Sequence, residues 1–164
     1  MLEPVLPTYR FCCEFLRRQL DQIDPADADL DPTGHLKTPR WQAGHLLVGD
    51  LFAADVVGLQ AGGPTLADLM PAFGPGSDPH AVPTDGPSMA DLTAAKAEIE
   101  GPLADAVRAA DASRFTGPHG IEFLNDWPLE TQTDLLAHLL STHFATHLGE
   151  LAMWRRAKGV PPLF

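Results

Sequence analysis

Four stretches of this sequence repeat apolar residues at intervals of three and four, and this spacing constrains the fold more than any other feature. Such intervals place side chains on one face of an α-helix. The helices that we predict cover residues 8–23, 39–59, 88–111 and 129–158. Because the segments between them are rich in proline, glycine and aspartate, the pattern predicts an all-α fold, a four-helix bundle with a long second connection.

Residues with a known preference for helix ends occur at several of these boundaries. Thr8 and Thr38 are predicted N-caps, and Ser88 begins a capping-box pattern. Gly159 is a predicted C-cap. Inside the third helix, Gly101-Pro102 predicts a kink.

Two segments between the predicted helices have little helical pattern. Residues 60–87 contain repeated prolines and glycines, which predicts an irregular crossover between the second and third helices. Residues 112–128 contain turn residues and a short apolar piece, 121–124, which we interpret as an extended element at the rim of the bundle.

Length and charge narrow the class of protein. A chain of 164 residues fits one domain, so we predict a single domain over residues 1–164. The formal net charge of −11 disfavours binding to nucleic acid or to anionic membrane surfaces. The sequence has neither a signal-peptide pattern nor an apolar run long enough to span a bilayer, and we expect a cytoplasmic protein.

The two cysteines, Cys12 and Cys13, are adjacent in a predicted helix. Neighbouring side chains diverge on a helix, so a disulfide between them would be strained. They also lack the two-residue spacer of a C-x-x-C redox site. We therefore predict reduced, buried thiols.

The strongest local signal for chemistry is a pair of histidines on the last predicted helix. His143 and His147 are four residues apart, which places both imidazoles on one face. The apolar stripe of that helix shares this face, so both point inward. Taken alone, such a pair is also found as ordinary core or surface histidines.

A third inward histidine, His45, lies on the second predicted helix, in a stripe with Trp41, Val48 and Phe52. Three neutral imidazoles with open coordination positions form a common catalytic arrangement for zinc, nickel or iron. Without a ligand, burying three unpaired imidazoles would be costly. We predict one divalent metal ion on His45, His143 and His147.

The sequence lacks the residues that several other classes of enzyme require. A zincin protease needs glutamate directly after the first histidine of its pair, and that position is Phe144 here. A di-iron bundle needs two Glu-x-x-His motifs, and the chain has none. Nucleotide-binding glycine loops and a G-x-S-x-G elbow are also missing.

The remaining polar candidates are secondary. We interpret His35, His80 and His119 as loop histidines that are solvated or structural, and we expect His138 to point away from His143. Asp50 and Asp55 are interpreted as exposed helix charges, with carboxylates supporting a metal ligand as the alternative. Glu150, one turn beyond His147, is a candidate for a supporting carboxylate, a fourth ligand or a proton shuttle.

The sequence resembles the DinB-like superfamily of bacterial metal-binding four-helix bundles, also called YfiT-like metal-dependent hydrolases. The resemblance covers nearly the whole chain. It rests on Thr38-Pro39-Arg40-Trp41 leading to His45-Leu46-Leu47, and on Leu135-Leu136-Ala137-His138 leading to His143-x-x-x-His147-Leu148-Gly149-Glu150-Leu151, with Arg155-Arg156 and Gly159. The family's histidine pattern maps onto His45, His143 and His147. Glu150 departs from it, because the family often has glutamine there, and the Gly49-Asp50 pair is not a family feature.

The resemblance implies a metal-dependent thiol S-transferase or hydrolase acting on a small molecule, with a low-molecular-weight thiol as a possible second cofactor. It also implies a homodimer. In this interpretation Glu150 or a loop carboxylate moves the proton. The alternative is a non-catalytic metal-binding or dimerisation module of a stress response. Fold alone does not choose between them.

Overall fold

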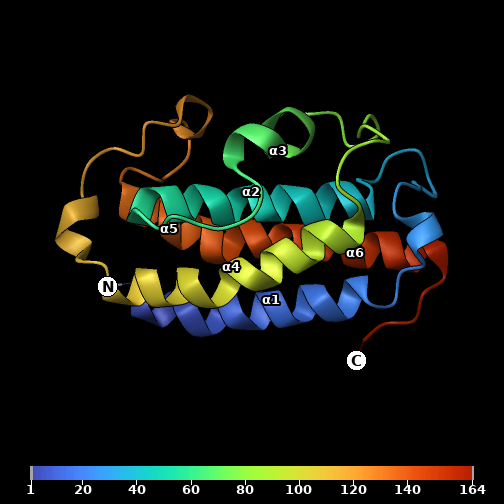
Figure 1. The fold of residues 1–164 in the computed structure, drawn as a ribbon, viewed down its shortest axis with the longest axis horizontal. Coiled ribbons are helices and arrows are strands. Elements are labelled where there is room, and N and C mark those ends of the chain that lie inside the picture. Colours follow the sequence, from blue (N-terminus) through green and yellow to red (C-terminus); the bar gives the residue numbers. More distant parts are fainter. Residues whose placement is uncertain (1, 164) are drawn as a thin grey trace.

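The computed structural model describes residues 2–163, and all regular structure in this range is helical (Figure 1). The prediction of an all-α fold is confirmed. The α-helices are α1 (Leu6–Leu20), α2 (Pro39–Val57), α3 (Leu66–Phe73), α4 (Met89–Ala109), α5 (Gln132–His138) and α6 (Phe144–Lys158).

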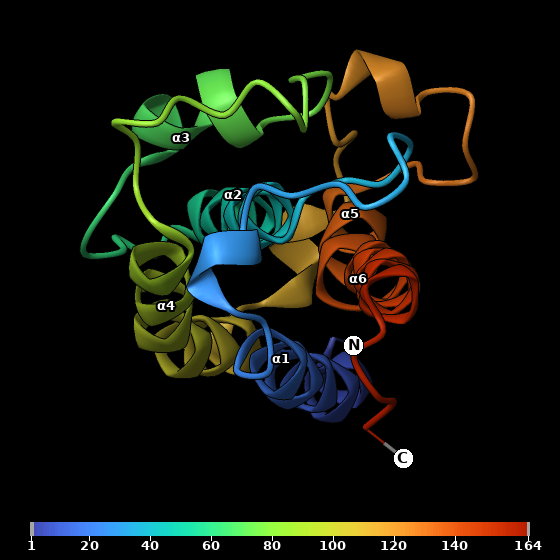
Figure 2. The same cartoon turned by 90° about the vertical axis from the view of Figure 1, so that its right-hand side faces the viewer.

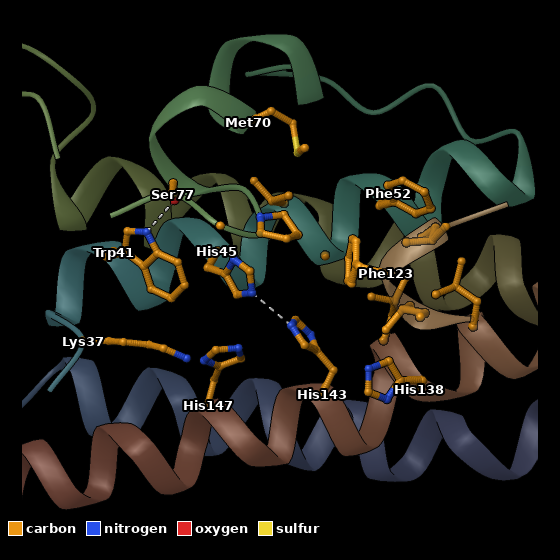
Figure 3. Close-up of a pocket in the computed structure, with 18 of the residues that line it drawn as sticks. Lys37, Trp41, His45, Phe52, Met70, Ser77, Phe123, His138, His143 and His147 are labelled. Atoms are coloured by element: carbon orange, nitrogen blue, oxygen red, sulfur yellow. Dashed lines mark hydrogen bonds between the residues drawn. The ribbon is translucent and has the colours of Figure 1, made fainter. Parts of the chain in front are cut away.

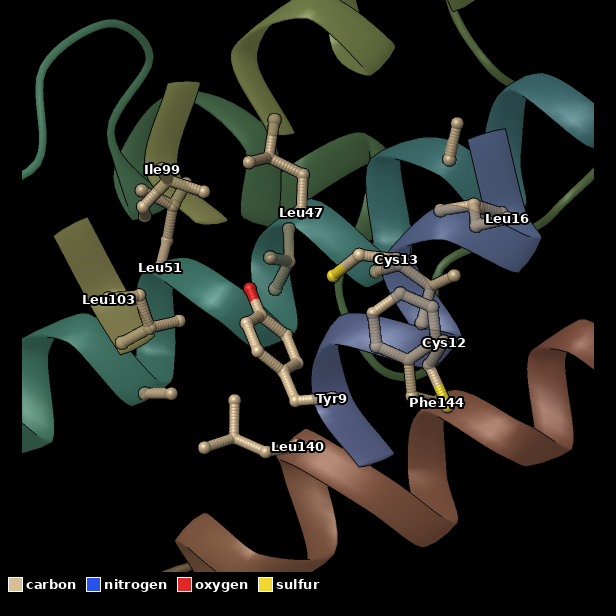
Figure 4. Packing of buried hydrophobic residues seen from close by; sticks show 14 of the residues in the cluster. Tyr9, Cys12, Cys13, Leu16, Leu47, Leu51, Ile99, Leu103, Leu140 and Phe144 are labelled. Carbon is tan, nitrogen blue, oxygen red and sulfur yellow. The ribbon is translucent and has the colours of Figure 1, made fainter. Parts of the chain in front are cut away.

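The long helices lie side by side around one apolar interior. Viewed along the long axis, α1, α2, α4 and α6 surround this interior, and α3 lies outside it, over α2 (Figure 2). Helix α2 contacts α3, α4 and α6, while α1 contacts α4 and α6. The buried apolar residues form one cluster to which α1, α2, α3, α4 and α6 contribute. Figure 4 shows part of it, around Tyr9, Leu47 and Phe144.

Helix α1 begins earlier than predicted. A 3-10 turn, Glu3–Val5, leads directly into it, and Pro7 occupies a first-turn position where its missing N–H costs nothing. The buried face includes Tyr9, Leu16 and Leu20, as well as Cys12 and Cys13, which are free thiols as predicted. Phe11 does not belong to this buried face. Phe11 lies two residues after the buried Tyr9, which is about 200° around the helix, and its side chain is 61% exposed.

Helix α2 agrees with the prediction at its start and nearly at its end. Thr38 is the N-cap and accepts a hydrogen bond from the Trp41 amide, with Pro39 at the first helical position. The helix ends at Val57, two residues before the predicted end, and Gly58 caps it in the left-handed conformation. Most of its side chains are buried, because other elements cover it on several sides.

The predicted irregular crossover over 60–87 contains a helix. Helix α3 begins at a full capping box between Thr65 and Asp68 and includes Pro71. Its last residue, Phe73, packs against α2 at Gly44, where an added Cβ would lie 2.3 Å from the Phe73 ring. A glycine at position 44 therefore permits the close approach of α3 to α2.

Helix α4 has the predicted capping box between Ser88 and Asp91 and ends two residues before the predicted boundary. Pro102 lies inside it, and the helix changes direction along its course (Figure 1). The predicted extended element over 121–124 is wrong, because Glu122–Leu124 is a 3-10 turn. A second 3-10 turn, Ala112–Phe115, precedes it.

The last predicted helix is interrupted by a π-helical turn. This helical region starts with α5, whose N-cap is Thr131, so it starts later than the predicted residue 129. It continues through the π turn Leu139–His143 into α6. Gly159 ends α6 in the left-handed conformation, as predicted. A π turn inserts one extra residue into the helix and so changes which side chains share a face.

Within residues 2–163, none of the helices combines the length and apolar character needed to cross a membrane.

Candidate metal centre

The structure brings the three predicted histidines together. His45 comes from α2, His143 from the π turn and His147 from α6. One ring nitrogen from each lies within 4.8 Å of the others. His45 and His147 are buried, and His143 is half-buried. Figure 3 shows their rings converging from two sides of the bundle. We call these three residues the histidine cluster.

The ring of His45 is held on two sides. Trp41, one turn earlier on α2, stacks on it with ring centroids 4.5 Å apart and an angle of 12° between the planes. Nδ1 of His45 lies 2.7 Å from the carbonyl oxygen of Phe73. A carbonyl oxygen only accepts, so Nδ1 carries the proton and Nε2 presents a lone pair toward His143. Burial, together with nearby His147, lowers the pKa of His45 to about 4, which keeps the ring neutral.

His147 is supported by a carboxylate. Oε2 of Glu150 lies 2.8 Å from Nδ1 of His147, and Oε1 of Glu150 accepts a hydrogen bond of 2.9 Å from Nζ of Lys37. Although burial opposes it, contact with His147 and Lys37 lowers the pKa of Glu150 to about 2, so the carboxylate is charged. A carboxylate behind a histidine fixes its tautomer and raises its basicity as a ligand. Of the three roles predicted for Glu150, this position favours that of a carboxylate that supports a metal ligand.

His143 has the least internal support. Its Nε2 lies 3.1 Å from Nε2 of His45, and its Nδ1 is buried with no hydrogen-bond partner among residues 2–163. Burial, with His147 and His45 nearby, lowers its pKa to about 2. Three imidazole nitrogens that converge in a largely buried position form a donor set, and a bound cation would use their lone pairs. The donor set therefore fits a borderline divalent cation such as zinc, nickel or iron.

A cavity of about 460 Å³ opens directly beside the histidine cluster. All three histidines line it, as does Lys37, whereas Glu150 does not. A ligand in the cavity would therefore meet the imidazole nitrogens, and Glu150 would act on it through His147 and Lys37.

The predicted orientation of His138 is wrong. Its ring centroid lies 5.6 Å from that of His143, and it lines the same cavity. Residues five apart diverge on an α-helix, but the intervening π turn, Leu139–His143, has more residues per turn and brings them together. Nδ1 of His138 lies 2.7 Å from the Thr142 hydroxyl.

The other three histidines lie away from the cluster, as predicted. His35 and His80 are exposed. His119 has a structural role, since Nε2 lies 2.8 Å from the Leu129 carbonyl oxygen and Nδ1 accepts a hydrogen bond from the Ile121 amide.

The interpretation of Asp50 as an exposed charge is wrong, whereas Asp55 is exposed as predicted. Asp50 is 2% exposed and accepts hydrogen bonds from Nζ of Lys96 and from the Tyr9 hydroxyl. It lies five residues beyond His45, on a different side of α2. Asp50 therefore supports the interior of the bundle and does not contact the histidine cluster.

Two supporting groups escaped the sequence analysis. Lys37 precedes the α2 cap and has no periodic signal, yet it reaches Glu150 on α6. The Phe73 carbonyl group belongs to a helix that the prolines of 60–87 concealed. Neither contact has a local sequence signature, because both depend on how distant segments pack.

Comparisons of this chain with protein-family models, with curated proteins and with solved structures find no match.

Proposed function

We propose that this chain is a metal-dependent enzyme of the DinB-like type that acts on a small molecule. The observation that carries the proposal is the histidine cluster at the edge of a cavity, with nitrogen atoms within 4.8 Å of one another. The all-helical fold, and the origin of the histidines in α2 and in the α5–α6 region, support the family resemblance.

The residues that would hold the metal are His45, His143 and His147. When bound, a divalent cation supplies a Lewis acid that lowers the pKa of a bound water or thiol. This chemistry suits a hydrolase or a thiol S-transferase, the two activities that the resemblance implies. Zinc, nickel and iron are the candidate ions, because imidazole suits all three.

The surrounding residues orient this donor set. Trp41 and the Phe73 carbonyl group fix the plane and tautomer of His45. Oε2 of Glu150 lies 2.8 Å from Nδ1 of His147, and we propose Glu150 as a positioning residue for that ring rather than a catalytic one. Lys37 balances the charge of Glu150 and lines the cavity, where it leaves the imidazole nitrogens accessible.

Metal analysis of the purified chain tests the site. We expect close to one divalent ion per chain in the wild type and almost none in His143→Ala. His138→Ala is the matched control, since His138 lies in the same cavity and contacts His143 but is outside the donor set. Equal metal content in all three proteins would overturn the proposed centre.

A second experiment tests the enzyme. The chain is loaded with Zn²⁺, Ni²⁺ or Fe²⁺ and assayed with low-molecular-weight thiols against reactive electrophiles, and with hydrolysable esters and amides. We expect turnover that disappears in His143→Ala. Full metal occupancy without turnover on any substrate would contradict the enzymatic proposal and favour a metal-binding module.

A further inference from the structure

The cavity beside the histidine cluster has a distinctive lining. Its volume of about 460 Å³ lies within the range of roughly 300–1,000 Å³ that is usual for small-molecule sites. Its walls come from α2, from the segment around α3, and from the 121–124 turn and α5 (Figure 3). The apolar lining residues are Trp41, Val48, Phe52, Met70, Pro75, Pro79, Ile121, Phe123, Leu124, Leu135 and Leu139.

The lysine and serine side chains that line the cavity are already engaged in contacts. No aspartate or glutamate in residues 2–163 lines the cavity, and its one lysine or arginine is Lys37, which is paired with Glu150. The Ser77 hydroxyl donates to the Gly74 carbonyl and accepts from the Trp41 indole N–H. A charged ligand would lose its hydration and find no free counter-charge.

The polar groups that remain are ring nitrogens of the histidine cluster and of His138. Those of the cluster lie along one wall, at the side of His45, His143 and His147, while Phe52, Phe123 and Met70 lie beyond them in the cavity (Figure 3). Aromatic rings and a methionine thioether pack well against another aromatic ring. The lining thus has a polar wall and an apolar, partly aromatic body.

Two apolar side chains at this cavity are exposed. Phe123 is 62% exposed and Met70 is 42% exposed, although both line the cavity. Exposed apolar groups at the rim of an apolar cavity would be covered by a ligand, which adds to the free energy of binding.

From this lining we infer that the cavity binds an uncharged aromatic small molecule, with one heteroatom group directed at the histidine cluster. The inference deepens the proposed function, because it names the class of substrate. It rests on that proposal only for the heteroatom end of the ligand. The aromatic body is held by the apolar walls whether or not a metal ion is present.

A matched pair of fluorescent probes tests the inference on the full chain. N-phenyl-1-naphthylamine is uncharged, and 8-anilinonaphthalene-1-sulfonate has the same rings with an added sulfonate. We expect saturable binding of one uncharged probe per chain, with affinity at least about tenfold higher than for the sulfonate, a difference of ~1.4 kcal/mol.

Two exposed aromatic residues provide a variant and its control. Phe123→Asp places a carboxylate at the cavity wall and is expected to weaken the uncharged probe about tenfold or more. Trp127→Asp alters a ring in the same region that is 65% exposed but does not line the cavity, and it should leave binding unchanged. Thermal unfolding checks that both variants are folded.

Equal affinity for the two probes, equal effects of the two variants, or no saturable binding would each overturn the inference. His143→Ala separates it from the proposed function, since we expect this variant to lose its metal and still bind the uncharged probe. Loss of metal with the loss of all probe binding would contradict the assignment of the apolar walls. Probe binding by a wild-type chain that takes up no metal when metal is supplied would overturn the metal centre alone.

Discussion

His45 and Asp50 lie five residues apart on α2, and both are buried, but the groups around them differ. Asp50 belongs to an ion-pair cluster with Lys96 from α4 and Tyr9 from α1. His45 belongs to the histidine cluster, whose other members come from the π turn and α6. One helix therefore places two polar clusters on different sides of itself.

The polar groups of the ion-pair cluster are hydrogen-bonded to one another. Lys96 and the Tyr9 hydroxyl both donate to Asp50, and the Lys96 ammonium lies 4.4 Å from the centroid of the Phe144 ring. Burial opposes the charge of Lys96, but the adjacent Asp50 carboxylate more than compensates and raises the pKa of Lys96. Burial also raises the pKa of neighbouring Cys13 to about 12, so this thiol is not a nucleophile at neutral pH.

The histidine cluster has the opposite character. The rings of His45 and His143 are neutral, Nδ1 of His143 has no partner among residues 2–163, and a cavity lies beside the cluster. A closed, charge-balanced cluster specifies how helices pack, whereas a cluster that is open to a cavity is available to a ligand. Burial of a polar residue therefore does not by itself identify a functional site.

We expect the greatest loss of stability when the ion pair between Lys96 and Asp50 is removed. Lys96→Met leaves the Asp50 carboxylate buried with only Tyr9 as a donor, which should lower the free energy of unfolding by about 3–5 kcal/mol. Chemical denaturation measures this. The double variant Lys96→Met/Asp50→Asn removes both charges and keeps an acceptor for Tyr9, so it should recover part of the loss.

Metal content separates the two clusters in the same variant. Folded Lys96→Met protein should keep its metal, because Lys96 does not contact the histidine cluster. A loss of stability below about 1 kcal/mol, well under the cost expected for an unpaired buried charge, would show that Asp50 does not depend on Lys96. Loss of metal from folded protein would show that the clusters are coupled.

A smaller effect is expected at Gly44, which connects α3 to the histidine cluster. In Gly44→Ala the new Cβ would lie 2.3 Å from the Phe73 ring, so α3 must move and Phe73 with it. Overpacking of this kind costs about 1–3 kcal/mol. Because the Phe73 carbonyl oxygen accepts from His45, metal affinity should fall as well.

The control for Gly44→Ala is Gly101→Ala, in α4, where an added Cβ meets no atom within 4 Å. Alanine there should be neutral or slightly stabilising, since it restricts the unfolded chain. Denaturation and metal titration of both variants make the comparison. Equal stability and equal metal affinity in the two variants would show that the approach of Phe73 to α2 is not required.

Sequence periodicity identified the histidine cluster because each of its members lies on an apolar helical stripe. The caps at Thr38 and Ser88 also fixed two helix starts correctly. These features depend on residues that are close in sequence, where helical geometry leaves few alternatives. The metal, the reaction and the dimer remain predictions.

The errors have specific physical causes. Helix α3 has a capping box at Thr65 and Asp68, the same signal as at Ser88, but the surrounding prolines concealed it. A charged residue on a helix is usually exposed, which predicts an exposed Asp50, but apolar residues occur all around α2 and its other sides are also buried. The orientation of His138 depends on a π turn, for which the sequence has no evident local signal.

The smallest change that we expect is in metal affinity, on substitution of Glu150 next to the histidine cluster. Glu150→Gln removes the charge beside Nδ1 of His147 and keeps an oxygen that can accept a hydrogen bond. Removal of a group that supports a metal ligand usually costs about 10–100-fold in affinity, and we expect the lower end, about tenfold, for this conservative change. Competition with a chelator measures it.

The control for this variant is Glu98→Gln, on an exposed position of α4, which removes the same charge away from the cluster. If both variants lose equal affinity, net charge and not the contact with His147 controls the metal. If Glu150→Gln instead loses the metal completely, the carboxylate is a ligand and not a positioning residue. A tenfold loss confined to Glu150→Gln would mean that the Glu150 carboxylate adjusts the metal affinity of the histidine cluster. In the ion-pair cluster, by contrast, the Asp50 carboxylate is required for the stability of the fold.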